Sequence, residues 1–211
     1  MNGIIFDVDG TLWDSTEEVA IAWNQALREN TQIDLVLTPE ILKKEFGKPM
    51  EVIIDDLFPG LPKEEQNRIE EYVISYENKR MEKASCILYD QMQETIKKLS
   101  KRYPLFIVSN CQSGYIEAFL KNTGLEDCIR DHLCPGDTGA FKADNIRIIM
   151  ERNGLQSAVY VGDTQGDADA CKEAGIPMIY AAYGFGQVEC PQVAIQSMGE
   201  LKTMDFDSLF F

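Results

Sequence analysis

Histidine is almost absent from this sequence, which has only His132 among its 211 residues. Mechanisms of the Ser-His-Asp and Cys-His types depend on a histidine base, so this scarcity argues against both. Six cysteines occur, but no two have the CxxC spacing of zinc or thioredoxin-like sites. No basic segment precedes the first apolar run, so no export signal is indicated. We therefore expect reduced thiols and a cytoplasmic location.

Long apolar runs and positive charge are also scarce. No apolar stretch approaches the roughly 20 residues that span a bilayer, which predicts no membrane association. Lys and Arg number 20 against 35 Asp and Glu, which gives a formal net charge of −15. Nucleic acids and anionic lipids require clustered positive charge, so the sequence disfavours both as partners. An anionic substrate would need a metal ion or local cations at its site.

Four short apolar runs share one pattern. They are continuous rather than alternating, and they read GIIFDVD, LFIVSN, AVYVGD and PMIYAAYG. Such runs are typical of parallel strands that helices cover on both faces. Helical patterns that close on glycine separate the later runs, and DHLCP is a candidate for a further short strand. The alternation predicts an α/β fold with a doubly wound parallel sheet.

Residues 15–85 interrupt this alternation, because they contain helical patterns and no convincing strand. Ser15 and Glu18 have the spacing of a capping box, which predicts that the first of these helices begins there. Three further helical patterns follow it. We therefore expect an α/β core formed by residues 1–14 and 86–211, with a helical cap inserted after the first strand.

Polar residues end three of the predicted strands, at the edge where open α/β sheets bind their ligands. In chain order they are Asp7, Asp9, Ser109, Asn110, Asp163 and, just beyond, Asp167. Carboxylates that converge in one crevice repel one another strongly unless some are protonated or a cation binds. An oxygen-only ligand set favours a hard divalent cation, and Mg²⁺ is the expected one.

The spacing of Asp7 and Asp9 suits phosphoryl chemistry. In an extended chain the two side chains point the same way, roughly 6.5 Å apart. One carboxylate could attack phosphorus while the other protonates the leaving oxygen. Ser109 and the helix after it could bind a phosphoryl oxygen, and Lys142 could neutralise its charge. An Asx turn would explain DVDG equally well by itself, so the joint pattern is what favours the chemistry.

The ordered motifs resemble those of the haloacid dehalogenase (HAD) superfamily. DVDGTLWDS is similar to its first motif, IVSN to its second, the lysine of FKADNI to its third and VYVGDTQGDADA to its fourth. The resemblance spans residues 4–170. The helical insertion resembles the cap of the subfamily that includes phosphoglycolate phosphatases and β-phosphoglucomutases.

Carried over by position, the resemblance implies that Asp7 is a nucleophile that forms an aspartyl-phosphate. It implies that Asp9 is the general acid and then the general base, and that Lys142 completes the catalytic set. The implied Mg²⁺ ligands are Asp7, Asp9 through its backbone carbonyl, Asp163 and Asp167. The implied substrate-binding residues are Thr11, Ser109 and Asn110, and we add Lys48 from its place in the sequence. Lys48 lies in a Gly-Lys-Pro turn between cap helices, and we expect it to face the core and contact the leaving group.

The predicted function is that of a Mg²⁺-dependent phosphatase acting on a small, soluble phosphorylated metabolite. A β-phosphoglucomutase-like sugar phosphomutase and a non-catalytic phosphometabolite-binding protein are the alternatives. Asp9 argues against the binding protein, because binding alone does not need it. It also argues against the dehalogenases of the superfamily, which lack an acid at this position. The sequence leaves the substrate and the oligomeric state open.

Overall fold

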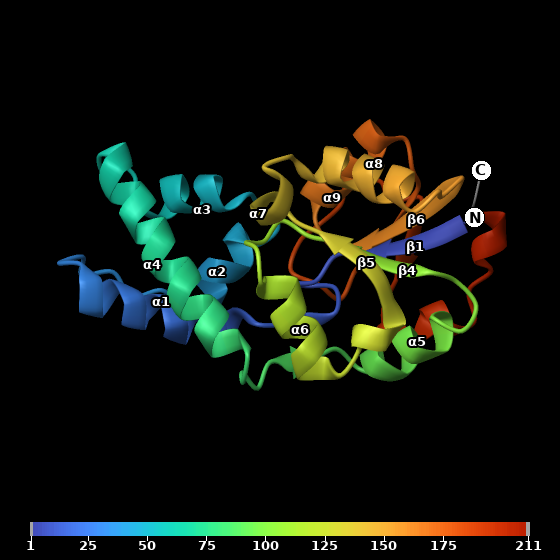
Figure 1. Cartoon of the computed structure of the whole chain (residues 1–211), viewed down its shortest axis with the longest axis horizontal. Helices are drawn as coiled ribbons and strands as arrows, with labels where there is room; N and C mark the ends of the chain where they lie inside the picture. Colours follow the sequence, from blue (N-terminus) through green and yellow to red (C-terminus); the bar gives the residue numbers. More distant parts are fainter. Residues whose placement is uncertain (1, 210–211) are drawn as a thin grey trace.

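The computed structural model describes residues 2–209 and is built around one six-stranded parallel sheet (Figure 1). The strand order is β5-β4-β1-β6-β7-β8, which confirms the predicted doubly wound α/β class. The strands are β1 (Asn2–Phe6), β4 (Leu105–Val108), β5 (Ile129–Leu133), β6 (Ser157–Gly162), β7 (Met178–Ala181) and β8 (Val193–Ile195). The DHLCP run contributes to β5, as expected. The three residues of β8 are too few to give a strand pattern in the sequence.

Helices cover both faces of the sheet, so its strands are buried on each side. Ile4 and Phe6 of β1 point into one hydrophobic cluster, and Ile5 between them points into another. In Figure 1, α5 and α6 lie on one side of the sheet and α8 and α9 on the other. The helices are α5 (Met92–Leu99), α6 (Tyr115–Thr123), α7 (Pro135–Thr138), α8 (Lys142–Arg152) and α9 (Gln165–Ala174). This burial explains why the strands read as continuous apolar runs.

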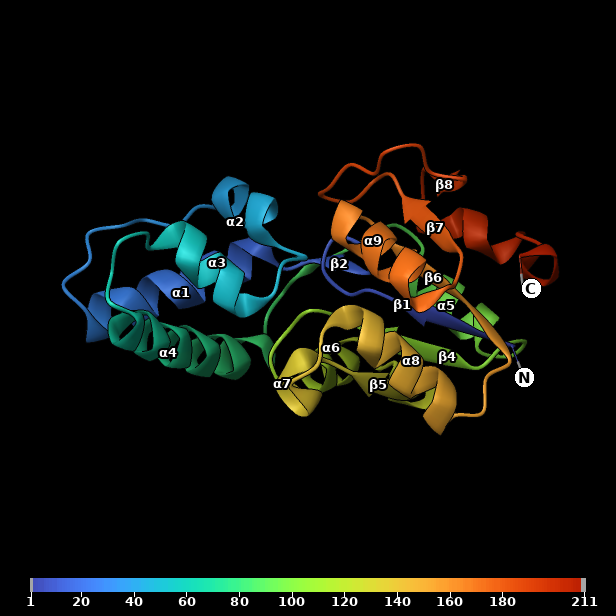
Figure 2. The same cartoon turned by 90° about the horizontal axis from the view of Figure 1, so that it is seen from above.

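The helical insertion forms a lobe beside the sheet (Figure 2). It consists of α1 (Thr16–Asn30), α2 (Pro39–Glu45), α3 (Met50–Leu57) and α4 (Lys63–Met81). Residues 15–85 contain no strand, as the sequence predicted. Within residues 2–209, no helix is both long and apolar enough to cross a membrane.

The predicted capping box at the start of α1 is wrong. Ser15 does occupy the N-cap position, but its hydroxyl accepts no hydrogen bond from the helix N–H groups and instead donates to Asp9 Oδ1 (2.5 Å). Glu18 forms an ion pair with Arg80 of α4 (2.6 Å). Asp14 instead accepts from the backbone N–H of Thr16 (3.0 Å). Tertiary partners therefore replace the local bonds that the spacing suggested.

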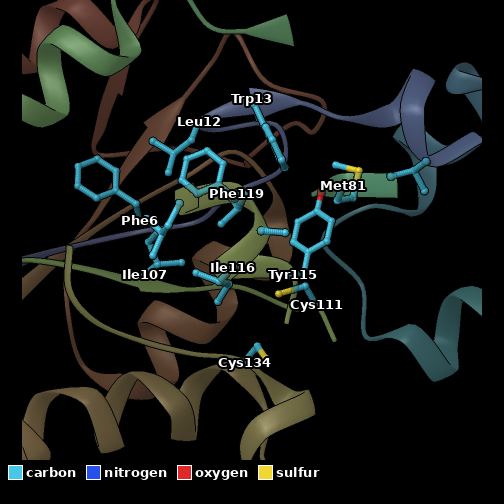
Figure 3. Packing of buried hydrophobic residues seen from close by; sticks show 14 of the residues in the cluster. Phe6, Leu12, Trp13, Met81, Ile107, Cys111, Tyr115, Ile116, Phe119 and Cys134 are labelled. Carbon is cyan, nitrogen blue, oxygen red and sulfur yellow. The ribbon is translucent and has the colours of Figure 1, made fainter. Parts of the chain in front are cut away.

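A short ribbon connects the cap with the core. Its strands, β2 (Trp13–Asp14) and β3 (Ile87–Leu88), pair antiparallel where the chain leaves the core and returns. Two-residue strands leave no sequence pattern, so the ribbon was not predicted. The Trp13 ring packs edge-on against Phe119, with the ring centroids 4.9 Å apart. Figure 3 shows Trp13 beside Tyr115 and Met81, within a hydrophobic cluster that extends from the sheet into the cap.

Candidate active site

A buried lysine joins two carboxylates at the carboxyl ends of the strands. Asp7 directly follows β1, and Lys142 is the first residue of α8. Lys142 Nζ lies 3.1 Å from Asp7 Oδ1 and 2.5 Å from Asp167 Oδ1. Burial alone would lower the pKa of Lys142, but the neighbouring charges of Asp167 and Asp7 raise it above its ordinary value. The ammonium group therefore remains charged although it is almost inaccessible to solvent.

Asp163, directly after β6, and Asp167, in the first turn of α9, lie close to each other. Thr11 Oγ1 donates to Asp163 Oδ1 (3.1 Å), and the backbone N–H of Phe185 donates to Asp163 Oδ2 (2.8 Å). Asp167 Oδ2 accepts from the backbone N–H groups of Asp163 (3.1 Å) and Thr164 (2.9 Å) at the start of α9. Asp167 is thus a helix-capping residue on one oxygen and the partner of the buried lysine on the other.

Gly10 allows the first motif to approach Asp163. Its φ is 81°, and a Cβ atom at this position would lie 2.2 Å from Asp163 Oδ2. A side chain here would therefore need both a strained backbone and a displaced carboxylate. The close approach of Gly10 to Asp163 explains why a glycine stands at this position of DVDG. This is a second reason for the glycine, besides the tight turn that the sequence suggested.

Three of these carboxylates fit a divalent cation. Asp7, Asp163 and Asp167 each offer one oxygen, and these oxygens lie within 4.8 Å of one another. Burial, reinforced by the neighbouring carboxylates, raises the pKa of Asp163 to about 8 and that of Asp7 to about 6. When all three carboxylates are ionised and Lys142 is charged, these four side chains together carry a net charge of −2. An oxygen-only set with this charge suits Mg²⁺.

Asp9 occupies a different environment from Asp7. Its Oδ1 accepts hydrogen bonds from Ser15 Oγ (2.5 Å), Tyr115 Oη (2.7 Å) and Trp13 Nε1 (3.0 Å). Burial nevertheless raises the pKa of Asp9 to about 7, because desolvation outweighs these bonds. A carboxyl group with such a pKa can both donate and accept a proton near neutral pH.

Sequence reasoning missed the residues that hold Asp9. Trp13 and Ser15 lie in the same motif, DVDGTLWDS, and their polar side chains could have been recognised as local donors. Tyr115 is 106 residues away and carries no such signal. Tyr160 was treated as a strand residue only. Its hydroxyl donates to the Val108 carbonyl (2.6 Å) beneath the site, and Lys142 Nζ lies 5.7 Å from its ring centroid.

The other core residues named from the sequence also lie at this edge of the sheet. Ser109 follows β4, is buried and hydrogen-bonds the Asp7 carboxylate. Asn110 Nδ2 donates to the backbone carbonyl of Gly47 (2.8 Å), so it joins the core to the cap. The Thr11 hydroxyl is directed to Asp163, where it positions that carboxylate.

Lys48 lies in the cap, in the loop between α2 and α3. Its Nζ forms ion pairs with Glu45 (2.6 Å) and Asp56 (2.8 Å), both of which belong to the cap. The loop does face the core, since the adjacent Gly47 contacts Asn110. The side-chain charge of Lys48 is therefore partly compensated by its own domain.

Two cavities meet at this loop. The smaller, about 30 Å³, lies between the aspartates of the first motif and the cap. Its lining consists of Asp7, Asp9, Trp23, Phe46, Gly47, Met50, Ile53, Glu77, Ser109, Asn110, Cys111 and Gln112. Such a volume holds about one water molecule. The wider cavity, about 900 Å³, opens between the α2–α3 loop and the starts of α8 and α9, and both Lys48 and Lys142 line it.

This fold and site define an α/β enzyme whose buried carboxylates and lysine meet at the strand ends, beneath a helical cap. Residues 4–181 match the model of the family described as haloacid dehalogenase-like hydrolase. The match covers most of the chain, and the protein belongs to this family of hydrolases. The resemblance seen in the four motifs is thereby confirmed.

Curated relatives and solved structures agree with this assignment. A phosphoglycolate phosphatase of Shigella boydii is 27% identical, over 95% of this chain and 91% of its own length. One from Vibrio vulnificus is 28% identical, over 88% and 86%. The structure of CbbY from Rhodobacter sphaeroides in complex with phosphate has a TM-score of 0.78 at 19% identity, covering 94% of this chain and 95% of that one. A predicted phosphoglycolate phosphatase from Haemophilus somnus has a TM-score of 0.80 at 20% identity, with coverage of 94% and 95%.

Proposed function

We propose that the protein is a Mg²⁺-dependent phosphatase that hydrolyses a small phosphomonoester through an aspartyl-phosphate on Asp7. The observation that supports this most is the contrast between two aspartates that line one cavity. Asp7 faces a charged lysine, which favours its ionised form. Asp9 has no such partner among residues 2–209, and burial raises its pKa to about 7. Paired carboxyl groups in unlike environments are typical of a nucleophile and an acid–base group.

In the first step, a carboxylate oxygen of Asp7 attacks phosphorus and the bond to the leaving oxygen breaks. Asp9 gives its proton to that oxygen, and the alcohol departs. Lys142 and Ser109 bind and orient the phosphoryl oxygens. Asp7, Asp163 and Asp167 would hold Mg²⁺, together with the backbone carbonyl of Asp9, and the ion would supply positive charge to the phosphoryl group.

In the second step, water attacks the phosphorus of the aspartyl-phosphate. Asp9, now ionised, accepts a proton from this water, so one residue acts as acid and then as base. Inorganic phosphate leaves and the Asp7 carboxylate is restored. The positions of Trp13, Ser15 and Tyr115 keep the Asp9 carboxyl oriented through both steps.

We also propose that residues 15–85 act as a movable cap on a core made of residues 1–14 and 86–211. The β2–β3 ribbon lies at this boundary and supports the division. The cavity beside the aspartates holds about one water molecule, whereas a phosphomonoester is several times larger. Substrate entry therefore requires the cap to separate from the core. Lys48 would lie at the mouth of the path, where the wider cavity begins.

The test is turnover of p-nitrophenyl phosphate, measured after removal of metal and again after addition of MgCl₂. We expect phosphate release only with the metal, and none from Asp7→Asn. Full activity in excess EDTA would contradict the metal requirement, and no turnover under any condition would contradict the phosphatase. Isomerisation of a sugar phosphate without release of phosphate would instead indicate the phosphomutase.

A further inference from the structure

The cap contributes a buried carboxyl group to the cavity that contains the catalytic aspartates. Glu77, on α4, is 4% exposed and lines this cavity together with Asp7 and Asp9. Its Oε2 accepts from Trp23 Nε1 (2.5 Å), and its Oε1 accepts from Gln112 Nε2 (3.0 Å). Glu77 has no ion-pair partner within residues 2–209.

The packing of the cap does not account for the charge of Glu77. Burial raises its pKa to about 7, which shows that the surroundings disfavour the carboxylate. A neutral glutamine could accept one of these two hydrogen bonds through its amide oxygen and would avoid this electrostatic cost. A group that costs stability and lines the active-site cavity is a candidate for contact with the substrate.

The lining of this cavity is acidic and contains no basic side chain among the described residues. Its charged members are Asp7, Asp9 and Glu77. The nearby lysines have other partners, since Lys142 binds two core carboxylates and Lys48 binds two cap carboxylates. Apolar side chains make up much of the cap side of the lining, including Trp23, Met50 and Ile53.

We propose that Glu77 is a specificity-determining residue that selects phosphomonoesters whose leaving alcohol carries a hydrogen-bond donor. A small alcohol with a second hydroxyl or an ammonium group would donate to the free lone pairs of Glu77. A leaving group that carries a carboxylate would face a like charge in a poorly solvated cavity, where repulsion is strong. The inference rests on the proposed phosphatase activity and specifies its substrate class. It predicts that 2-phosphoglycolate, the compound in the names of the curated relatives, is a poor substrate here.

Three phosphomonoesters of matched size separate these cases: 2-hydroxyethyl phosphate, O-phosphoethanolamine and 2-phosphoglycolate. We would measure kcat/KM for each with Mg²⁺ at about pH 8, above the pKa of Glu77. We expect the wild type to favour at least one donor-bearing ester over 2-phosphoglycolate by at least about tenfold. The better donor-bearing ester shows whether the natural leaving group is neutral or cationic.

Variants of Glu77 test whether this residue causes the preference for donor-bearing esters. Glu77→Gln should reduce the preference at least about fivefold, because it removes the like charge. Glu77→Asp keeps the charge and should keep the preference. Glu71→Gln, on an exposed position of the same helix, is the matched control and should change nothing. Turnover of p-nitrophenyl phosphate reports for each variant whether the fold and the chemistry are intact.

The outcomes are distinct. A wild-type preference for 2-phosphoglycolate would overturn the role of Glu77 and leave the phosphatase standing. An unchanged preference in Glu77→Gln, with p-nitrophenyl phosphate turnover retained, would do the same. Should Glu77→Gln lose all turnover, the wild-type preference and Glu77→Asp still decide the matter. No phosphate release by the wild type from any ester would overturn the proposed function itself.

Discussion

Two lysines, Lys142 of the core and Lys48 of the cap, form ion pairs that differ in burial and in sequence separation. Lys142 is buried and reaches Asp7 and Asp167, which are 135 and 25 residues away. Lys48 of the cap reaches Glu45 and Asp56, which are 3 and 8 residues away, and its side chain is 39% exposed. Burying charges costs several kcal/mol per ion, whereas exposed pairs contribute roughly 0–1 kcal/mol. The buried charges around Lys142 therefore call for a functional explanation, and the exposed charges around Lys48 do not.

Glu77 is the exception within the cap. Its burial and its raised pKa resemble those of Asp9 more than those of the other cap carboxylates. It lies where the cap meets the core, next to Gln112. Asp9 of the core and Glu77 of the cap line the same cavity where the cap meets the core. Carboxyl groups with raised pKa values therefore come from both parts of the sequence. Substitutions that remove single charges test this view.

Replacement of Asp7 should have the largest effect. Asp7→Asn has no carboxylate to attack phosphorus, so we expect turnover to fall by at least about 10⁴-fold on every substrate, however good the leaving group. Steady-state assays and mass spectrometry of the quenched protein would measure this. Asp127→Asn removes an exposed carboxylate and should retain full activity. A phosphoryl adduct on Asp7→Asn would show that another residue is the nucleophile.

Replacement of Asp9 should slow the second step most. The p-nitrophenolate group leaves without much help, but the attacking water still needs a base. Asp9→Asn should therefore give a burst of product and accumulate phosphorylated enzyme, with a steady-state loss of about 10²–10⁴-fold. Rapid mixing with p-nitrophenyl phosphate tests this. Wild-type steady-state turnover would mean that Asp9 is not the acid–base group.

Replacement of Asp163 should separate metal binding from folding. Asp163→Asn removes one anionic oxygen from the buried triad, so we expect a loss of about 10²-fold in activity at saturating Mg²⁺. Wild-type protein should melt at a higher temperature when Mg²⁺ is added, since a ligand that binds only the folded state stabilises it. This shift should vanish in Asp163→Asn and persist in Asp144→Asn, which changes an exposed residue. Equal shifts in both variants would place the metal elsewhere.

Glu77 should make stability depend on pH. Its pKa is about 7 in the folded protein, against an ordinary 4.5, so the folded state binds more protons than the unfolded state between these values. The free energy of unfolding should therefore fall as the pH rises through this window. Glu77→Gln lacks this loss, so its stability relative to wild type should improve by about 3 kcal/mol from about pH 5 to about pH 9.

Urea unfolding at several pH values measures this difference. Glu71→Gln is again the control, because it removes an exposed carboxylate from the same helix. A constant difference between Glu77→Gln and wild type across the pH range would show that Glu77 keeps an ordinary pKa. In that case Glu77 would not share the electrostatic character of the core carboxylates.

Lys48 should have the smallest effect. It lines the wider cavity, but two cap carboxylates already compensate its charge. Lys48→Ala should raise KM for phosphomonoesters by about twofold to fivefold, through weaker attraction of the anionic substrate, and leave kcat unchanged. Lys63→Ala, in a cap ion pair with Glu51, is the matched control. A loss of kcat comparable to that of Asp9→Asn would give Lys48 a catalytic role.

The sequence determined the fold class and the main polar residues of the site, because both depend on local patterns. Continuous apolar runs mark strands that are buried on both faces, and polar residues directly after them mark the edge where ligands bind. Asp7, Asp9, Ser109 and Asp163 could be named for this reason. Lys142 could be named because it opens a helix within an ordered set of motifs.

Tertiary structure alone decided the environment of each of these groups. Tyr115 contacts Asp9 across 106 residues, and Glu77 reaches the cavity lined by Asp7 and Asp9 only because α4 packs against the core. The Ser15 hydroxyl was predicted to cap a helix, yet it donates to Asp9 and accepts from Tyr115 Oη (2.9 Å), because tertiary packing brings these two groups to it. Local sequence patterns indicate which face of a helix or strand is buried and where that helix or strand ends. Desolvation and long-range contacts set the pKa of a carboxyl group, and these exist only in the folded protein.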